Sequence, residues 1–568
     1  MTDSPLPPSL ADLQQWTAMI GRAQQMMLEQ SVAALDAGKE KGTGATPGTD
    51  AAPRDPWAEG LSAWQQFIAA TLPHEQQQPS QDKRFAAPAW QQNPFFAALR
   101  QAYEFIGEQL MRSVETMPGV DDRQRAQFRF AMRNFVDALS PTNFAFTNPQ
   151  VIERTLQTRG DNLRKGLQHM LDDMARGQMT HTPLGAFELG RNLATTPGKV
   201  VLRTPLFELI HYAPTTPQVL QTPLVIFPPW INRFYILDLT AEKSFIRWCL
   251  DQGISVFMVS WKSADASMKD IGWRDYIAAQ VEAIDTVRDL LDVPAVHAIG
   301  YCVAGTTLAA TLALLAARGE AEKVASATFF TAQVDFARAG DLSALITDEL
   351  LDRIDTLSPE GFLDGRYMAA TFNMLRSRDL VWNYVTNNYL LGEEYTPFDL
   401  LHWNGDVTNL PAGWHRSYLA DLYRDNLLVK PGAITIDGVP LDLARVETPT
   451  FVQAGREDHI APAESVWEIT RYFRGPLRFV LAGSGHIAGV VNPPAARKYR
   501  HWTNDAPAGS FAEFVAGATE HEGSWWPDWL AWLRGHDDTM VEAAGARIPG
   551  AGKLPALDDA PGRYVRAR

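Results

Sequence analysis

Three side chains of the types that catalyse acyl transfer follow strand-like segments of this sequence: Cys302, Asp458 and His486. Cys302 comes directly after the apolar run AVHAIGY (295–301), and a helical pattern starts at Val303. A sharp strand-to-helix turn of this form exposes a nucleophile above a sheet, and the helix N-terminus favours a thiolate. We therefore expect Cys302 to be a nucleophile, with the Val303 amide as one oxyanion donor. A buried structural cysteine is the alternative.

Asp458 and His486 follow two later strand-like segments, 449–455 and 477–483. The order nucleophile, acid, histidine is the chain order of the α/β hydrolases, in which each group stands just past a strand end. Glu457 is a rival for the acid role, and Asp458 could instead cap the helix that follows it. His486, in the setting Gly-His-Ile-Ala-Gly, could instead be a buried histidine with a structural role.

A second oxyanion donor is expected in the loop PPWINRFY (228–235), which follows the apolar run PLVIF (223–227). The amide of Ile231 is the candidate. The Gly-Ser-Gly at 483–485 is not followed by a helical pattern, so we do not expect a nucleophile there. The sequence contains no HExxH, paired-cysteine zinc pattern, P-loop or G-x-G-x-x-G after a strand, so we expect neither a metal nor a cofactor.

The elements that must position these groups alternate between strands and helices from about residue 199 onward. After a strand pair at 200–212, runs of strand length occur at 223–227, 254–261, 295–301, 327–336, 449–455 and 477–483, with helical stretches at 239–252, 274–291 and 303–318. This alternation predicts an α/β fold with a mostly parallel sheet covered on both faces. Residues 337–447 interrupt the pattern and are expected to form a helical cap over the pocket.

The chain before residue 199 is predicted to be helical, behind a poorly ordered tail. In the tail, residues 1–92, an amphipathic helix at 1–35 is joined to linkers rich in Gly, Pro and Gln. Residues 93–198 are expected to form a helical domain, and 199–568 the catalytic domain. Five tryptophans between 502 and 532 are expected to pack around a C-terminal helix.

Composition excludes several function classes. The chain has 568 residues, of which 46% are hydrophobic and two are cysteines, so it can bury a large core without a disulfide framework. Its 51 Lys and Arg against 66 Asp and Glu give a net charge of −15, which argues against a nucleic-acid binder. The longest apolar stretch, 303–317, is too short to span a membrane and no signal peptide is recognisable, so we expect a cytoplasmic protein without a transmembrane segment.

The motifs taken together resemble the polyhydroxyalkanoate synthases, and specifically the class I enzymes. The matching segments include SPTNFAFTNP (140–149), FELGRNLATTPGKVV (187–201), PPWINRFYILDL (228–239), GYCVAG (300–305), REDHIAP (456–462) and GSGHIAGVVNPP (483–494). One position departs from the family's G-x-C-x-G box: Ala304 occupies the fifth place, and Gly305 follows it. A methyl group there leaves Cys302 in register and affects local helix packing more than the chemistry.

The resemblance implies a substrate, an (R)-3-hydroxyacyl-CoA such as 3-hydroxybutyryl-CoA, and two products, a polyester and CoA. His486 would deprotonate Cys302 and then activate the attacking hydroxyl, while Asp458 would orient His486 or assist the hydroxyl. His459 would have a supporting role. The resemblance also implies a homodimer with a mobile cap, associated with polyester granules and their coat proteins (phasins).

Two alternatives stay open. The same three residues would serve an acyl-CoA thioesterase or an intracellular polyester depolymerase, and a non-catalytic granule-binding scaffold could keep the fold.

A polymerase must also keep water from its acyl enzyme. Aromatic residues of the insertion are expected to do this: Trp382, Tyr384, Tyr389, Phe398, Trp403 and Trp414.

Overall fold

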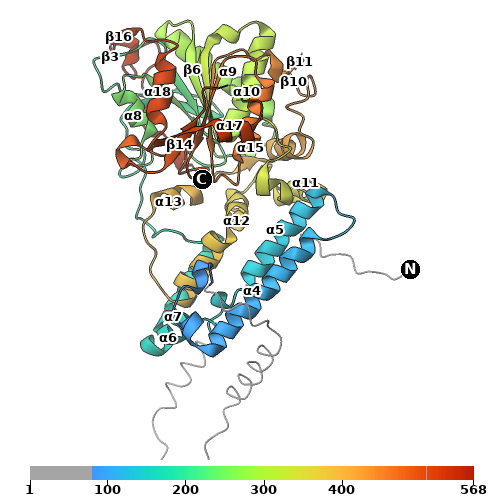
Figure 1. The fold of residues 1–568 in the computed structure, drawn as a ribbon. Coiled ribbons are helices and arrows are strands. Elements are labelled where there is room, and N and C mark those ends of the chain that lie inside the picture. Colours follow the sequence, from blue (N-terminus) through green and yellow to red (C-terminus); the bar gives the residue numbers. More distant parts are fainter. Residues whose placement is uncertain (1–79, 507, 568) are drawn as a thin grey trace, which may run out of the picture. The chain divides into compact units, whose positions relative to one another are not determined.

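The computed structural model describes residues 80–506 and 508–567, which form two compact units (Figure 1). One unit contains the described residues up to Pro183 together with Ala370–Thr396. The other contains Leu184–Ala369 and the chain from Pro397 onward. The amphipathic helix predicted at 1–35 lies outside the described residues, as does the linker that follows it.

The first unit is helical. Its main elements are α4 (Pro94–Glu115), α5 (Asp122–Ala138), α6 (Pro149–Thr158) and α7 (Asp161–Arg176). Asn93 and Asn148 cap α4 and α6, each accepting a backbone N–H two residues on, at 2.9 and 3.0 Å. Proline at the first position of both helices sets φ without losing a helical hydrogen bond.

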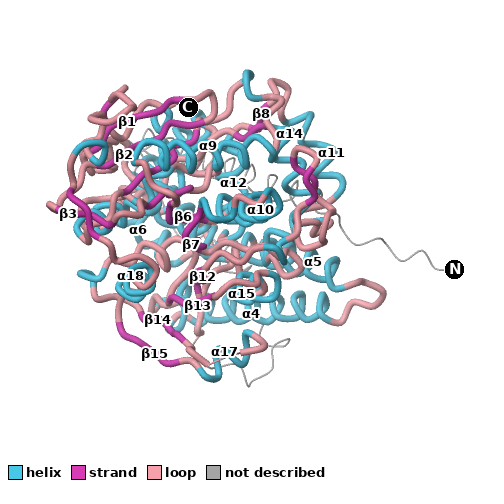
Figure 2. Tube along the Cα trace, turned by 90° about the horizontal axis from the view of Figure 1, so that it is seen from above, coloured by secondary structure: helices cyan, strands magenta, loops and turns pink. Residues whose placement is uncertain are grey.

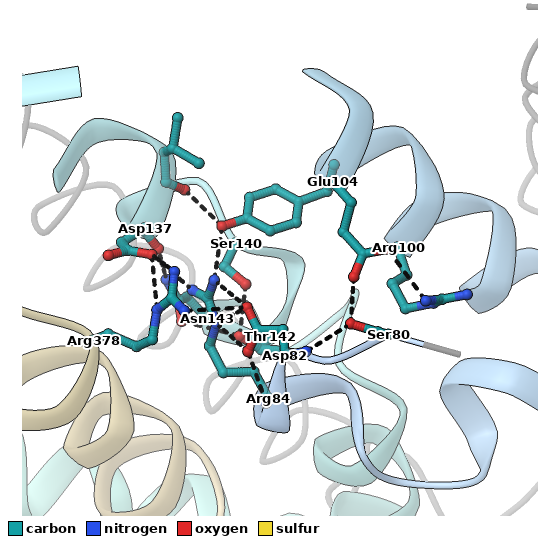
Figure 3. A network of polar contacts seen from close by, with 12 residues as sticks. Ser80, Asp82, Arg84, Arg100, Glu104, Asp137, Ser140, Thr142, Asn143 and Arg378 are labelled. Carbon is teal, nitrogen blue, oxygen red and sulfur yellow. Dashed lines mark hydrogen bonds and ion pairs between the residues drawn. The ribbon is translucent and has the colours of Figure 1, made fainter. Parts of the chain in front are cut away.

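Residues 80–92 are ordered, which corrects the prediction that the poorly ordered tail extends to residue 92. They contain a 3₁₀ turn (Lys83–Phe85) and the short helix α3 (Ala89–Gln92). Phe85 and Trp90 are buried and meet edge to face, with ring centroids 4.9 Å apart. Arg84 pairs with Asp82 at 2.7 Å in the network of Figure 3. The Gln- and Pro-rich composition of this segment did not indicate that Phe85 and Trp90 would be buried. The burial of these two aromatic side chains stabilises the segment.

Part of the predicted cap belongs to the helical unit. In Figure 3, Arg378 forms an ion pair of 2.9 Å with Asp137 of α5. The hydroxyl of Tyr389 donates to Asp173 of α7 at 2.5 Å. These bonds fix two π-helical turns, Arg378–Trp382 and Val385–Leu390, to α5 and α7.

The compact units therefore differ from the predicted boundaries in two places. The N-terminal part of the helical unit ends at Pro183 rather than 198. Residues 337–447 do not form one body, because Ala370–Thr396 belongs to the helical unit and the rest of the insertion to the second unit. Three aromatic residues expected to exclude water belong to the helical unit: Trp382, Tyr384 and Tyr389.

The second unit is built on a twisted sheet which, within the described residues, has eleven strands in the order β15-β14-β13-β12-β7-β6-β4-β5-β2-β1-β17. The six strands from β13 to β5 run parallel, and antiparallel strands extend both edges. The parallel strands are β4 (Leu224–Phe227), β5 (Val256–Trp261), β6 (Val296–Tyr301), β7 (Val324–Phe330), β12 (Thr450–Gly455) and β13 (Leu477–Ala482). The edge strands are β1 (Gly198–Arg203), β2 (Phe207–Tyr212), β14 (Arg500–Thr503), β15 (Thr519–Glu522) and β17 (Asp558–Asp559).

Every strand predicted in this unit is present, and the mostly parallel α/β sheet is confirmed. The strand expected at 327–336 is displaced toward the N-terminus and ends at Phe330, since Thr331 has φ +42° and turns the chain out of the sheet. The edge strands β14, β15 and β17 were not foreseen. They are short, and their exposed residues lack the apolar pattern of buried strands.

Helices cover both faces of the sheet (Figures 1 and 2). On one face α9 (Trp273–Leu291) packs on α10 (Val303–Arg318), and Gln280 of α9 donates to the Ala304 carbonyl at 3.0 Å. On the other face α8 (Phe245–Asp251) packs on α18 (Trp526–Arg534), where Phe245 and Trp526 meet edge to face at 5.0 Å. Of the five tryptophans expected to pack around the C-terminal helix, Trp525, Trp526 and Trp529 are fully buried, whereas Trp502 and Trp532 are partly exposed. None of the helices in the described residues is both long and apolar enough to cross a membrane.

Candidate active site

Cys302 occupies the turn between β6 and α10, with φ +54° and ψ −127°. Positive φ is strained for a residue with a side chain, and such strain is typical of a nucleophile elbow. Two glycines make the turn possible. A Cβ on Gly300 would lie 2.5 Å from the Gly305 Cα, and one on Gly305 would lie 2.4 Å from the Ala332 Cβ. Cys302 is partly exposed, whereas Cys249 is buried as an inert structural cysteine would be.

His486 and Asp458 meet beside this turn. His486 Nδ1 lies 2.7 Å from Asp458 Oδ2, and the Asp458 side chain is fully buried. The other oxygen, Oδ1, accepts the amides of Ile460 and Ala461 at 2.8 and 2.9 Å. Asp458 therefore both caps its own loop and holds the histidine. The rival acid Glu457 is exposed.

The electrostatics of the site favour a charged histidine. Burial by itself lowers the pKa of His486, but the charges of Asp458 and Cys302, with hydrogen bonds to both, raise that pKa to about 10. The ring thus interacts with the carboxylate through one nitrogen and is in hydrogen-bonding reach of the thiol. An imidazolium in this position is the counter-ion that a thiolate nucleophile requires.

Hydrogen bonds join the three segments that carry Cys302, Asp458 and His486. The Tyr301 hydroxyl, one residue before the cysteine, donates to the His486 carbonyl at 2.9 Å. The Glu457 amide donates to the Ser484 carbonyl at 3.0 Å, which joins the aspartate loop to the histidine loop. Sequence reasoning did not single out Tyr301, although this hydroxyl-bearing residue stands directly before the predicted nucleophile Cys302.

The two predicted oxyanion donors, Val303 and Ile231, lie in the segments that follow two neighbouring strands, β6 and β4. Val303 is the first residue of α10, so its amide has no carbonyl four residues earlier within the helix. Phe227, the last residue of β4, pairs with Gly300 of β6, so the loop 228–235 leaves the sheet beside the elbow. Ile231 in that loop is 8% exposed. The structure thus brings both segments to the same sheet edge, and their function as donors stays a prediction.

Two tyrosines of the insertion were not predicted as site residues. Tyr418 and Tyr423 lie in a π-helical turn (Tyr418–Arg424). Burial raises the pKa of each phenol, and the charge of the nearby Cys302 raises it further. Because the insertion is distant in sequence, only the fold brings these phenols to Cys302. His459 lies in the aspartate loop, partly buried, and its supporting role stays a prediction.

A cysteine on a strand-to-helix elbow, with a buried His–Asp pair on two later loops of a parallel sheet, defines a chain of the α/β-hydrolase class. In the described residues no group of three or more His, Cys, Asp or Glu side chains is placed to hold a metal ion. A family model described as "alpha/beta hydrolase fold" matches residues 222–493. A second, described as "Poly-beta-hydroxybutyrate polymerase (PhaC) N-terminus", matches residues 81–249.

Curated relatives match over most of the chain. A poly(3-hydroxyalkanoate) polymerase of Methylorubrum extorquens is 45% identical, covering 90% of this chain and 84% of the relative. A poly(3-hydroxyalkanoate) polymerase subunit of Cupriavidus necator is 44% identical over 86% of this chain and 84% of its own length. A polymerase of Ectopseudomonas oleovorans is 37% identical over 86% and 87%. The chain belongs to the poly(3-hydroxyalkanoate) polymerase family, which confirms the resemblance found in the sequence.

Proposed function

We propose that this enzyme polymerises an (R)-3-hydroxyacyl-CoA, such as 3-hydroxybutyryl-CoA, into polyester through an acyl-Cys302 intermediate. Family membership supports the polymerisation. The observation that carries the mechanism is the His486–Asp458 contact of 2.7 Å beside a cysteine at φ +54°. The proposal requires no cofactor, because CoA enters with the substrate and leaves as product.

In the acylation step, the Cys302 thiolate attacks the thioester carbonyl. The S–C bond to Cys302 forms, the bond to CoA breaks, and His486 gives its proton to the departing CoA sulfur. The Val303 and Ile231 amides would stabilise the oxyanion of the tetrahedral intermediate. A thioester replaces a thioester, so the acyl group stays activated for the next step.

In the transfer step, a 3-hydroxyl gives its proton to His486 and its oxygen attacks the acyl-Cys302 carbonyl. An ester bond forms and the Cys302 thiolate leaves, so the site returns to its starting state. The role of Asp458 that we favour is orientation of His486. Its side chain is fully buried, and its two oxygens already accept from His486 and from two backbone amides.

The test is to supply 3-hydroxybutyryl-CoA and to measure CoA release and acyl product together. CoA release with high-mass polyester is the expected result. CoA release with free 3-hydroxybutyrate alone would replace the proposal with a thioesterase. Cleavage of added polyester, without CoA chemistry, would indicate a depolymerase, and inertness toward both substrates a scaffold. Cys302→Ala must abolish CoA release, because a methyl group cannot accept the acyl group.

We further propose a homodimer that works in the cytoplasm on polyester granules, in contact with phasin-type coat proteins. Exposed apolar side chains of the helical unit support contact with an apolar surface: Ile106, Phe146, Leu156 and Met174 are each at least 56% exposed. Replacing Leu156 and Met174 by serine should reduce sedimentation with granules while leaving CoA release unchanged. Unreduced sedimentation would remove this unit from granule contact.

A further inference from the structure

The loop that carries Ile231 is fixed on one side by a short segment of the insertion. We name residues 228–235 the oxyanion loop and residues 403–408 the bracing segment. The bracing segment begins within the last turn of α13 (Asp399–Gly405) and continues past the end of this helix to Thr408. Asn232 forms an isolated antiparallel bridge with Val407, and the Trp403 indole donates to the Arg233 carbonyl at 2.6 Å. Both segments belong to the same compact unit.

Thr408 holds both peptide planes that flank Ile231. Its hydroxyl donates to the Trp230 carbonyl, and its amide donates to the Ile231 carbonyl at 3.2 Å. A trans peptide is planar, so its N–H points opposite to its C=O. Fixing the Trp230 carbonyl therefore fixes the direction of the Ile231 N–H. Thr408 is 3% exposed, so water does not compete for these bonds.

The bracing segment is itself held by a buried ion pair. Arg233 Nε lies 2.9 Å from Asp406 Oδ1, with side-chain exposures of 2% and 6%. The Tyr235 hydroxyl donates to the other Asp406 oxygen at 2.9 Å. Arg233 also donates to the Ala567 carbonyl at 2.8 Å. A buried arginine and carboxylate satisfied by several hydrogen bonds hold one geometry, because loss of either partner leaves an unpaired buried charge.

We propose that Thr408 is a positioning residue for acyl transfer: it aims the Ile231 amide at the developing oxyanion. The bracing segment is therefore a fixed part of the catalytic frame rather than of a movable cap. This inference rests on the proposed function, in which Cys302 is acylated and Ile231 stabilises the oxyanion.

The test compares two reactions of the same cysteine. Acylation by 3-hydroxybutyryl-CoA passes through an oxyanion, whereas alkylation by iodoacetamide needs the thiolate but no oxyanion donor. In Thr408→Val, which keeps the shape and loses the hydroxyl, we expect kcat for CoA release to fall about 10- to 100-fold with KM unchanged. The rate of Cys302 alkylation should stay at the wild-type value. Thr408→Ser, which keeps the hydroxyl, should retain most of the kcat.

Thr450→Val is the matched control. Thr450 is equally buried and donates to a backbone carbonyl at 2.9 Å, but it lies at the opposite end of β12 from the Asp458 loop. If Thr408→Val does not fold, Tyr235→Phe takes its place, since it removes one bond to Asp406; a smaller fall in kcat with unchanged alkylation is expected.

Three outcomes would overturn the inference: wild-type kcat in Thr408→Val, an equal loss of alkylation and turnover, or equal impairment of Thr408→Ser. Failure of the proposed function looks different. Without an acyl-Cys302 intermediate, the wild-type enzyme would continue to release CoA after complete alkylation of Cys302, and a thioesterase would release CoA and free 3-hydroxybutyrate without polyester, whatever residue stands at position 408.

Discussion

Replacing Asp458 by asparagine tests the central interaction of the site. The asparagine carbonyl can still accept the amides of Ile460 and Ala461, which leaves its NH₂ group facing His486 Nδ1. Two donors cannot share that contact, so the histidine changes tautomer or turns away. The imidazolium also loses its buried counter-charge, and the amide offers none.

The size of the effect follows from the pKa of His486. A rise from 6.5 to about 10 corresponds to about 5 kcal/mol of net stabilisation of the imidazolium, at 1.36 kcal/mol for each pH unit. Asp458 and Cys302 both contribute to this rise. If Asp458 supplies half, its loss costs about 2–3 kcal/mol, or about a 10²-fold fall in the rate of CoA release.

The assay is CoA release at saturating 3-hydroxybutyryl-CoA, with the rate of Cys302 alkylation at neutral pH measured beside it. Asp458→Asn should slow the alkylation, because the imidazolium that pairs with the thiolate is weakened. Glu457→Gln is the control, since it removes an exposed carboxylate from the next position. Activity of Asp458→Asn within threefold of wild type, or an equal loss in Glu457→Gln, would refute the reasoning.

Three further predictions concern the histidine and the elbow. Because the folded-state pKa of His486 lies above 6.5, its stabilisation is complete below about pH 6.5 and is lost as pH rises through about 10. The cost of His486→Gln in free energy of unfolding should therefore shrink over that window in urea titrations; a constant cost would contradict it. Gly300→Ala places a methyl group 2.5 Å from the Gly305 Cα. It should lower the free energy of unfolding by about 1–3 kcal/mol, measured by thermal unfolding, and reduce activity. Ala304→Gly restores the family's box and should lower stability by about 1 kcal/mol, as glycine does inside a helix, while CoA release stays near wild type; a large gain in activity would show that Ala304 limits the chemistry.

Much of the catalytic unit was determined by local sequence. Buried parallel strands require continuous apolar runs, so 295–301, 449–455 and 477–483 predicted β6, β12 and β13 within a residue or two. A strand running into a small-residue turn and then a helix is compatible with an elbow, and the chain order of Cys302, Asp458 and His486 favoured that interpretation over a buried structural cysteine. The positions of Cys302, Asp458 and His486 just past these strands follow from that pattern, because parallel strands bring their carboxyl ends to one edge.

Tertiary structure decided what depends on contacts between distant segments. Nothing in the residues near Ala370–Thr396 indicates that this part of the insertion packs with α5 and α7, since its partners Asp137 and Asp173 lie more than two hundred positions earlier. The choice of Asp458 over Glu457 depended on burial, which adjacent carboxylates do not reveal in sequence. The sequence likewise did not single out Thr408: its two hydrogen bonds reach the loop that carries Ile231, and only the folded chain brings the two segments together.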